Sequence, residues 1–319
     1  MSTGPSGHVA RSANGPHFKI RGVTREVTWG GTSFRTFLRT VDGVRINSVY
    51  NPAAAERVTG KDISRPPSHD LVFVIAHGFT GNADRPHVRR IARAFARHGA
   101  VVTFSFRGHG ASGGRSTLGD REVLDLAAAV SWARELGHTR VATVGFSMGG
   151  SVVLRHAALG GEGNGHGDGG GGSSAGASAS ASASASAGAG GPDAVVSVSG
   201  PARWFYRGTA PMRRVHWLAT RPSGRLVGRY GLRTRIHHRD WDPVPLSPVE
   251  AVPRIAPTPL LVVHGDRDGY FPLDHPRMLA AAAGEHGELW VEPGMGHAES
   301  AAPDGLLHRI GDWVVARAG

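Results

Sequence analysis

The chain has 319 residues, no cysteine and a formal net charge of +11 at pH 7. Its length suits one large α/β domain or two small ones, and the lack of cysteine excludes a disulfide framework and a thiolate metal site. Nearly all of the positive charge is arginine, because Lys19 and Lys61 are the only lysines. Since no helix-turn-helix, RNP-type or zinc-finger pattern accompanies the charge, we expect no nucleic-acid partner.

The N-terminal residues 1–22 are polar and rich in Gly and Ser, which predicts a disordered tail before a single domain over residues 23–319. The start of the chain lacks the apolar core that a signal peptide needs. No stretch approaches the ~18 continuous apolar residues of a membrane span. We therefore expect a cytoplasmic protein.

The first half of the domain alternates apolar strand-like runs with amphipathic helical segments. Continuous apolar runs are typical of strands buried on both faces of a parallel sheet, joined by right-handed crossovers. An antiparallel hairpin with the turn signal Asp42-Gly43 precedes them. The predicted strands are residues 24–29, 33–41, 44–50, 71–76, 100–106 and 141–144, and the predicted helices are 86–98, 120–136 and 152–159, with a polar loop at 51–69.

Two unusual segments interrupt the second half. Residues 160–192 are Gly-rich and then alternate Ala and Ser, a composition that predicts a flexible insertion without a packed core. Residues 200–257 are rich in Trp, Arg and Pro, and we interpret them as an irregular, cap-like segment. The remaining predicted elements are strands at 194–199, 260–263 and 288–292 and helices at 275–283 and 303–316.

A G-x-S-x-G pattern at residues 145–149 contains the candidate nucleophile, Ser147. A chain with 47 Gly produces such matches by chance, and a second one at residues 110–114 contains Ser112. Ser147 directly follows an apolar strand and precedes a helix, whereas Ser112 lies in a Gly-rich loop. A sharp strand-to-helix turn lifts a serine hydroxyl clear of the sheet edge, so this context selects Ser147.

Asp268 and His297 also lie just past predicted strands, where open α/β sheets place their sites. Because a serine hydroxyl needs a base to remove its proton as it attacks, His297 is the candidate base and would later return the proton to the leaving group. Asp268 would hold the imidazole in the required tautomer. The N–H of Met148, at a helix N-terminus, is a candidate donor to the developing oxyanion.

Neighbouring residues offer alternatives to these assignments. Asp266 is the alternative acid, and Glu299 stands only two residues after the candidate base, which is poor geometry for orienting it. Among the 18 histidines, His77 and His264 also follow strands, but each precedes a glycine and we interpret both as structural. His109 either approaches the site or shapes its own loop, and we favour the loop.

Taken together, these motifs resemble the α/β-hydrolase-fold serine hydrolases of the esterase and lipase kind, over about residues 24–317 without the insertion. The resemblance implies an α/β-hydrolase fold: a mostly parallel central sheet with an antiparallel N-terminal hairpin, helices on both faces and a short cap. It implies Phe79 as the second oxyanion donor, and it favours Asp268 over Asp266 as the acid because a hydrophobic-Pro pair follows. The matching pieces are residues 77–80, 107–112, 145–150, 264–268, Phe271-Pro272 and Gly296-His297.

We therefore predict a hydrolase of small-molecule carboxylic esters that acts through an acyl-enzyme, with a Ser-His-Asp triad. A thioesterase, acyltransferase or peptidase would use the same residues, and a non-catalytic binding protein of this fold is a further alternative. Epoxide hydrolases and haloalkane dehalogenases are disfavoured, because they have Asp where Ser147 stands. The sequence has no metal-ligand cluster, phosphate-binding loop or dinucleotide fingerprint, so we expect no metal and no cofactor.

Residues 194–239 of the cap region contain ten arginines and no Asp or Glu. Arg221, Arg225, Arg229 and Arg233 recur every four residues, and aromatic residues are interleaved with them. Such a segment either receives an anionic or acyl-chain substrate, contacts an anionic membrane surface, or is a solvated face paired with acidic residues elsewhere.

Overall fold

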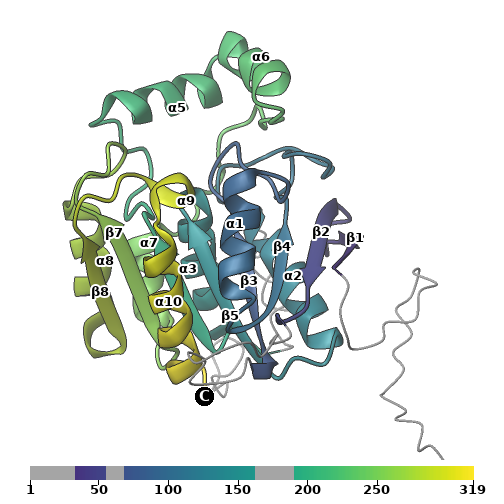
Figure 1. The fold of residues 1–319 in the computed structure, drawn as a ribbon. Coiled ribbons are helices and arrows are strands. Elements are labelled where there is room, and N and C mark those ends of the chain that lie inside the picture. Colours follow the sequence, from purple (N-terminus) through teal and green to yellow (C-terminus); the bar gives the residue numbers. More distant parts are fainter. Residues whose placement is uncertain (1–32, 55–67, 162–189) are drawn as a thin grey trace, which may run out of the picture. The chain divides into compact units, whose positions relative to one another are not determined.

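A central sheet of eight strands organises the protein in the computed structural model, which describes residues 33–54, 68–161 and 190–319 (Figure 1). The strand order is β1-β2-β4-β3-β5-β6-β7-β8. The strands are β1 Phe34–Arg39, β2 Arg45–Asn51, β3 Ser68–Ala76, β4 Gly99–Phe104, β5 Arg140–Phe146, β6 Ala194–Val198, β7 Leu260–Gly265 and β8 Gly287–Glu292.

The sheet combines an antiparallel edge with a parallel body. β1 pairs with β2 and β2 with β4 in antiparallel register, while the pairs from β4 to β8 are parallel. Gly43 takes a φ of +81° in the turn between β1 and β2, and the Thr40 hydroxyl donates to Asp42. The predicted hairpin and the mostly parallel sheet are therefore confirmed.

Helices cover both faces of the sheet (Figure 1). One layer holds α1, α9 and α10, and the other holds α2, α3, α7 and α8. Between the first layer and the sheet, the rings of Phe73 and Phe95 stack with centroids 4.9 Å apart. The bounds are α1 Pro86–Phe95, α2 Glu122–Glu135, α3 Met148–Gly161, α7 Pro248–Ala251, α8 Asp274–Ala283, α9 Ala298–Ala301 and α10 Asp304–Arg317, with 3-10 turns η1 Val252–Arg254 and η2 Gly284–His286.

The cap differs from the irregular segment predicted over residues 200–257. It contains two helices, α5 Ala210–Thr220 and α6 Pro222–Gly231, in addition to α7 and η1. Proline occupies the first turn of both cap helices, where its missing N–H is tolerated, and Thr209 caps α5 by accepting from the Met212 N–H. α5 buries no residue and α6 buries only two glycines, so neither helix contributes an apolar side chain to the core.

Several predictions lie wholly or largely outside the described residues. These are the tail at 1–22, the strand at 24–29, most of the loop at 51–69 and most of the insertion at 160–192, of which Gly160 and Gly161 end α3. α3 itself begins at Met148, earlier than the predicted 152. No helix within the described ranges is long and apolar enough to cross a membrane.

Buried, uncharged histidines are a notable feature of the core. His156 on α3 has an Nδ1 with no partner among the described residues, and burial lowers its pKa to about 4. In an unfolded chain a histidine has a pKa near 6.5. Between these values the unfolded state binds a proton that the folded state does not, so the stability contributed by neutral His156 is complete above pH ~6.5 and is lost as pH falls towards about 4.

His156→Leu should therefore flatten the loss of stability in acid. Between pH 7 and pH 5 we expect the variant to lose ~2 kcal/mol less unfolding free energy than the wild type. Urea unfolding at the two pH values measures this difference. His87→Leu, at a partly exposed position on α1, is the control and should retain the wild-type pH dependence. If wild type and His156→Leu lost the same unfolding free energy between pH 7 and pH 5, neutral His156 would not contribute to the pH dependence of stability.

Candidate active site

The turn between β5 and α3 holds Ser147 at a φ of +52°, a conformation that residues other than glycine rarely adopt. Two glycines make this turn feasible. A Cβ at Gly145 would lie 2.1 Å from the carbonyl oxygen of Gly149, and a Cβ at Gly149 would lie 2.1 Å from the carbonyl oxygen of Ala76 on β3. Both positions therefore exclude side chains, and Ser147 lies at the C-terminal edge of the sheet.

Ser147, His297 and Asp268 form one continuous hydrogen-bonded chain. His297 Nε2 lies 2.9 Å from Ser147 Oγ, and His297 Nδ1 lies 2.8 Å from Asp268 Oδ2. Because an ionised carboxylate can only accept, Nδ1 carries the proton that is donated to Asp268. Nε2 is then free to accept the proton of the serine hydroxyl. The fold thus brings together three residues that follow three different strands.

Asp268 is well suited to remain ionised at the back of this chain. Burial by itself raises the pKa of its carboxyl, but the hydrogen bond and charge of His297, together with backbone N–H donors, hold the pKa below the ordinary value. Those donors are the N–H groups of Tyr270 and Phe271, at 2.8 and 3.1 Å from Asp268 Oδ1. The alternative acid, Asp266, is exposed and accepts from the Gly294 N–H instead.

Aromatic rings fix the plane of the His297 imidazole. The Tyr270 ring stacks on it at a centroid distance of 4.1 Å and an interplanar angle of 21°. Phe271 meets it edge-on at 5.7 Å. Sequence reasoning noticed Phe271 only within a family pattern and missed Tyr270. The available signal was an aromatic pair directly after Asp268-Gly269.

Phe79 and Met148 follow the ends of two adjacent strands, β3 and β5, and Met148 directly follows Ser147. β3 and β5 pair in parallel register up to Ala76 and Gly145, so the segments that follow them enter the same space. Both residues line the cavity that contains Ser147. Within the described part of the chain, no protein acceptor takes either N–H. The two donors are therefore available to a ligand oxygen that approaches the serine from the cavity.

The other residues weighed from the sequence have structural partners. Ser112 is buried, with its Oγ donating to the Ser105 carbonyl and accepting from the Asn47 N–H. His77 Nε2 accepts from the Phe106 N–H, and burial lowers the pKa of His77 well below its usual value. His109 Nε2 accepts from the Thr80 N–H, and its Nδ1 donates to the Arg107 carbonyl. His109 thus supports the turn that follows Phe79.

Glu299 is a residue whose placement sequence reasoning did not foresee. It is buried at the start of α9, it lines the same cavity as Ser147, and its carboxylate accepts from the Gly78 N–H. It makes no hydrogen bond to His297 among the described contacts, so it does not act as the acid of the chain. Its position is set by Arg90, whose guanidinium donates to the carbonyls of Glu299 and Ala302.

A cavity of about 1030 Å³ opens at Ser147, between the sheet edge and the cap. Figure 1 shows α5 and α6 lying across the C-terminal ends of the strands, above this space. The apolar part of the lining comes mainly from the cap: Trp204, Phe205, Met212, Val215, Leu218, Leu232, Trp241 and Val244. No group of three or more His, Cys, Asp or Glu able to hold a metal ion occurs within the described ranges.

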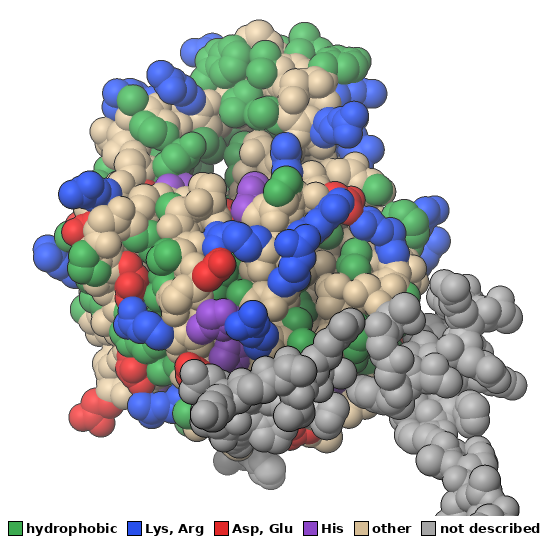
Figure 2. Space-filling view, in the orientation of Figure 1, with side chains coloured by type: hydrophobic (Ala, Val, Ile, Leu, Met, Phe, Trp, Pro, Cys, Tyr) green, Lys and Arg blue, Asp and Glu red, His purple; other side chains and the backbone are tan. Residues whose placement is uncertain are grey.

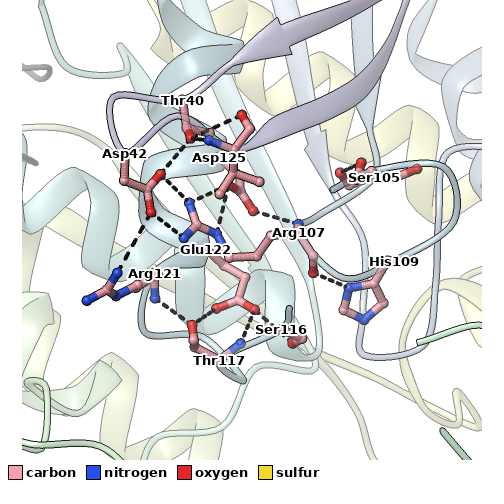
Figure 3. A network of polar contacts seen from close by, with 12 residues as sticks. Thr40, Asp42, Ser105, Arg107, His109, Ser116, Thr117, Arg121, Glu122 and Asp125 are labelled. Atoms are coloured by element: carbon pink, nitrogen blue, oxygen red, sulfur yellow. Dashed lines mark hydrogen bonds and ion pairs between the residues drawn. The ribbon is translucent and has the colours of Figure 1, made fainter. Parts of the chain in front are cut away.

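A buried ionic network anchors the loop that carries part of the cavity wall (Figure 3). Arg107 pairs with Asp42 at 2.7 Å and with Asp125 at 2.8 Å. Burial alone would lower the pKa of Arg107, but the two carboxylates raise it, so the guanidinium stays charged. Glu122 accepts from the N–H groups of Thr117 and Gly119, which continue the same loop.

The cap is joined to this loop by hydrogen bonds. Trp241 Nε1 donates to the Thr117 carbonyl at 2.7 Å, and isolated β-bridges link His109 with Thr234 and Ser116 with Ile236. The network around Arg107 therefore supports the cap as well as the loop.

The arginines of the cap have few acidic partners. Of those in residues 194–239, only Arg203 forms an ion pair with an acid of the described part, Asp274. Arg225 donates to the Ala219 and Thr220 carbonyls at the end of α5. The four-residue spacing runs along α6, where Arg229 lies over the Tyr230 ring. Figure 2 shows arginine side chains beside hydrophobic ones over the cap, so its outer face is basic and partly apolar.

The strand order and the serine at the turn after β5 define an α/β-hydrolase architecture. A family model described as the alpha/beta hydrolase family matches residues 71–309, and the chain belongs to that family. The resemblance and fold predicted from the sequence are confirmed, and with them the assignment as a hydrolase.

Individual relatives are similar at lower identity. The chain is 28% identical over 282 residues to a monoacylglycerol lipase of Mycolicibacterium smegmatis, covering 77% of this chain and 88% of the lipase. Among solved structures, an esterase of Pyrococcus furiosus matches with a TM-score of 0.61 and 20% identity, covering 90% of this chain and 93% of the esterase. The α/β-hydrolase GrgF of a Penicillium species matches with a TM-score of 0.58 and 18% identity, over 90% and 99% of the two chains.

Gly149→Ala should destabilise the protein by about 3 kcal/mol, because the new Cβ would overlap the backbone of β3 at Ala76. Urea unfolding measures the loss. The matched control is Gly305→Ala in the first turn of α10, where a Cβ meets no atom within 4 Å, and it should be neutral or mildly stabilising. Equal stabilities of the two variants would contradict the steric role of Gly149.

Proposed function

We propose that the protein is a carboxylic-ester hydrolase that works through an acyl-serine intermediate. The observation that carries this proposal is the hydrogen-bonded chain from Ser147 through His297 to Asp268. A serine whose hydroxyl faces a neutral imidazole, with an ionised carboxylate behind it, is equipped for nucleophilic attack on an acyl carbon.

The proposed reaction proceeds in two halves. Ser147 Oγ attacks the ester carbonyl while His297 Nε2 takes its proton, and Asp268 stabilises the resulting imidazolium. The N–H groups of Phe79 and Met148 hold the negative oxygen of the tetrahedral intermediate. Collapse breaks the ester C–O bond, and His297 gives its proton to the departing alcohol. A water molecule, deprotonated by His297, then releases the acid and restores Ser147 Oγ–H.

The cavity favours a substrate with an acyl chain. Its apolar lining under α5 and α6 offers a hydrophobic surface next to the serine, and burial of each methylene group contributes about 0.8 kcal/mol. The lipase and esterase names of the relatives agree with an ester substrate. A series of nitrophenyl esters of rising chain length should therefore show kcat/KM increasing until the chain fills the cavity.

Ser147→Ala should abolish ester hydrolysis, with kcat falling by at least about 10⁴-fold, and should abolish labelling by a fluorophosphonate probe. The matched control is Ser112→Ala, the serine of the second G-x-S-x-G, which should keep labelling and activity within about tenfold of the wild type because its hydroxyl bonds only to loop backbone. Folded protein that is not labelled at Ser147 would refute the enzyme proposal and favour a binding protein of this fold.

The arginines at the cavity offer a separate test of the cap. Arg214 lines the cavity and has no ion pair within the described residues, whereas Arg229 is exposed on α6 and does not line it. Arg214→Glu should raise KM for hemisuccinate-type anionic esters by about tenfold and leave neutral esters unchanged. Arg229→Glu is the matched charge reversal and should change neither. Equal effects on anionic and neutral esters would exclude anion binding at Arg214.

A further inference from the structure

Glu299 places a carboxylate beside the serine in a position that the proposed ester hydrolysis does not use. One of its oxygens, Oε1, accepts from the Gly78 N–H. A Cβ built at Gly78 would lie 3.2 Å from each carboxylate oxygen and 3.3 Å from Ser147 Cβ. Glu299 and Ser147 therefore both lie next to Gly78, where a side chain would force its neighbours to shift by a few tenths of an ångström.

The second oxygen of Glu299 is unsatisfied by the protein. No donor of the described residues bonds to Oε2, and the Glu299 carboxylate has no ion pair among them. The nearby guanidinium of Arg90 instead donates to backbone carbonyls and pairs with Asp304. Glu299 lines the cavity, so a donor in the cavity, either water or a group of the substrate, can complete the hydrogen bonding of Oε2.

The alcohol part of an ester would bring a donor to this place. The leaving oxygen has to meet His297 Nε2 to receive its proton, while the carbonyl oxygen faces the Phe79 and Met148 N–H groups. The acyl chain occupies the apolar region under the cap. The substituents on the alcohol then extend beside His297. Glu299 lies two residues after His297, in the short helix α9.

We propose that Glu299 forms a subsite for a hydroxyl group on the alcohol of the substrate, so that the enzyme selects monoesters of neutral polyols. The inference rests on the proposed ester hydrolysis. Oε1 holds the Gly78–Phe79 peptide and thereby orients the Phe79 N–H, and Oε2 accepts the substrate hydroxyl. An alcohol that carries its own carboxylate would be repelled from the same place.

Glu299→Gln tests the subsite while keeping the hydrogen bond from the Gly78 N–H. The amide oxygen can still accept from the Gly78 N–H, and the NH₂ group, which can only donate, then faces the cavity. The substrates are the glycerol monoester and the propyl ester of decanoic acid, which share the acyl group and the three-carbon alcohol skeleton. Wild-type enzyme should have the higher kcat/KM for the glycerol ester. Glu299→Gln should lower the ratio of kcat/KM for the glycerol ester to kcat/KM for the propyl ester by about tenfold or more.

The matched control is Glu250→Gln, since Glu250 also accepts a backbone N–H, that of Ser247, at the start of a short helix, and does not line the cavity. It should keep the wild-type preference. A preference unchanged in folded Glu299→Gln, with Ser147-dependent hydrolysis intact, would overturn the subsite alone. If the variant does not fold, the wild type alone decides: equal kcat/KM for the glycerol ester and the propyl ester would overturn the subsite as well. Absence of both hydrolysis and fluorophosphonate labelling in the wild type would overturn the proposed function.

Discussion

The close approach of α3 to the end of β3 is the constraint on which the site depends. Gly149 packs against the Ala76 carbonyl at a separation that leaves no room for a side chain. This contact holds the start of α3 next to the segment after β3, so that Met148 and Phe79 line the same cavity as Ser147. His297 and Asp268 come from more distant strands, but they reach Ser147 because parallel strands end at one edge of the sheet.

The parts of this arrangement that follow buried strands were predictable from sequence, because continuous apolar runs locate strands and chemistry-bearing residues stand directly after them. Of the two cap helices, only α6 was indicated by the sequence, through the four-residue spacing of its arginines, and neither α5 nor α6 buries an apolar side chain that would mark a core helix. Glu299 was missed for a different reason. Its contact with Gly78 joins residues far apart in the chain, and only the folded structure shows that the carboxylate accepts from the Gly78 N–H just past the end of β3.

The Arg107 network and the active-site chain use buried acidic side chains for different purposes. At Arg107, two acids neutralise one guanidinium and hold a loop in place, and the cap is bonded to that loop through Trp241 and the Ser116 bridge. At Asp268, the carboxylate faces an imidazole whose charge changes during the proposed reaction. Glu299 completes a third arrangement, in which a carboxylate is bonded on one side and open to the cavity on the other.

The sparse burial of α5 and α6 has a consequence for motion. A segment with few buried contacts opens locally at a lower free energy than the core that it covers, and amide hydrogen exchange reports such openings one by one. α5 and α6 are therefore expected to open at a lower free energy than β5 and α3, whose residues are mostly buried. Opening of α5 and α6 would thus control access to Ser147, whereas the packing of β5 and α3 holds Ser147 in place.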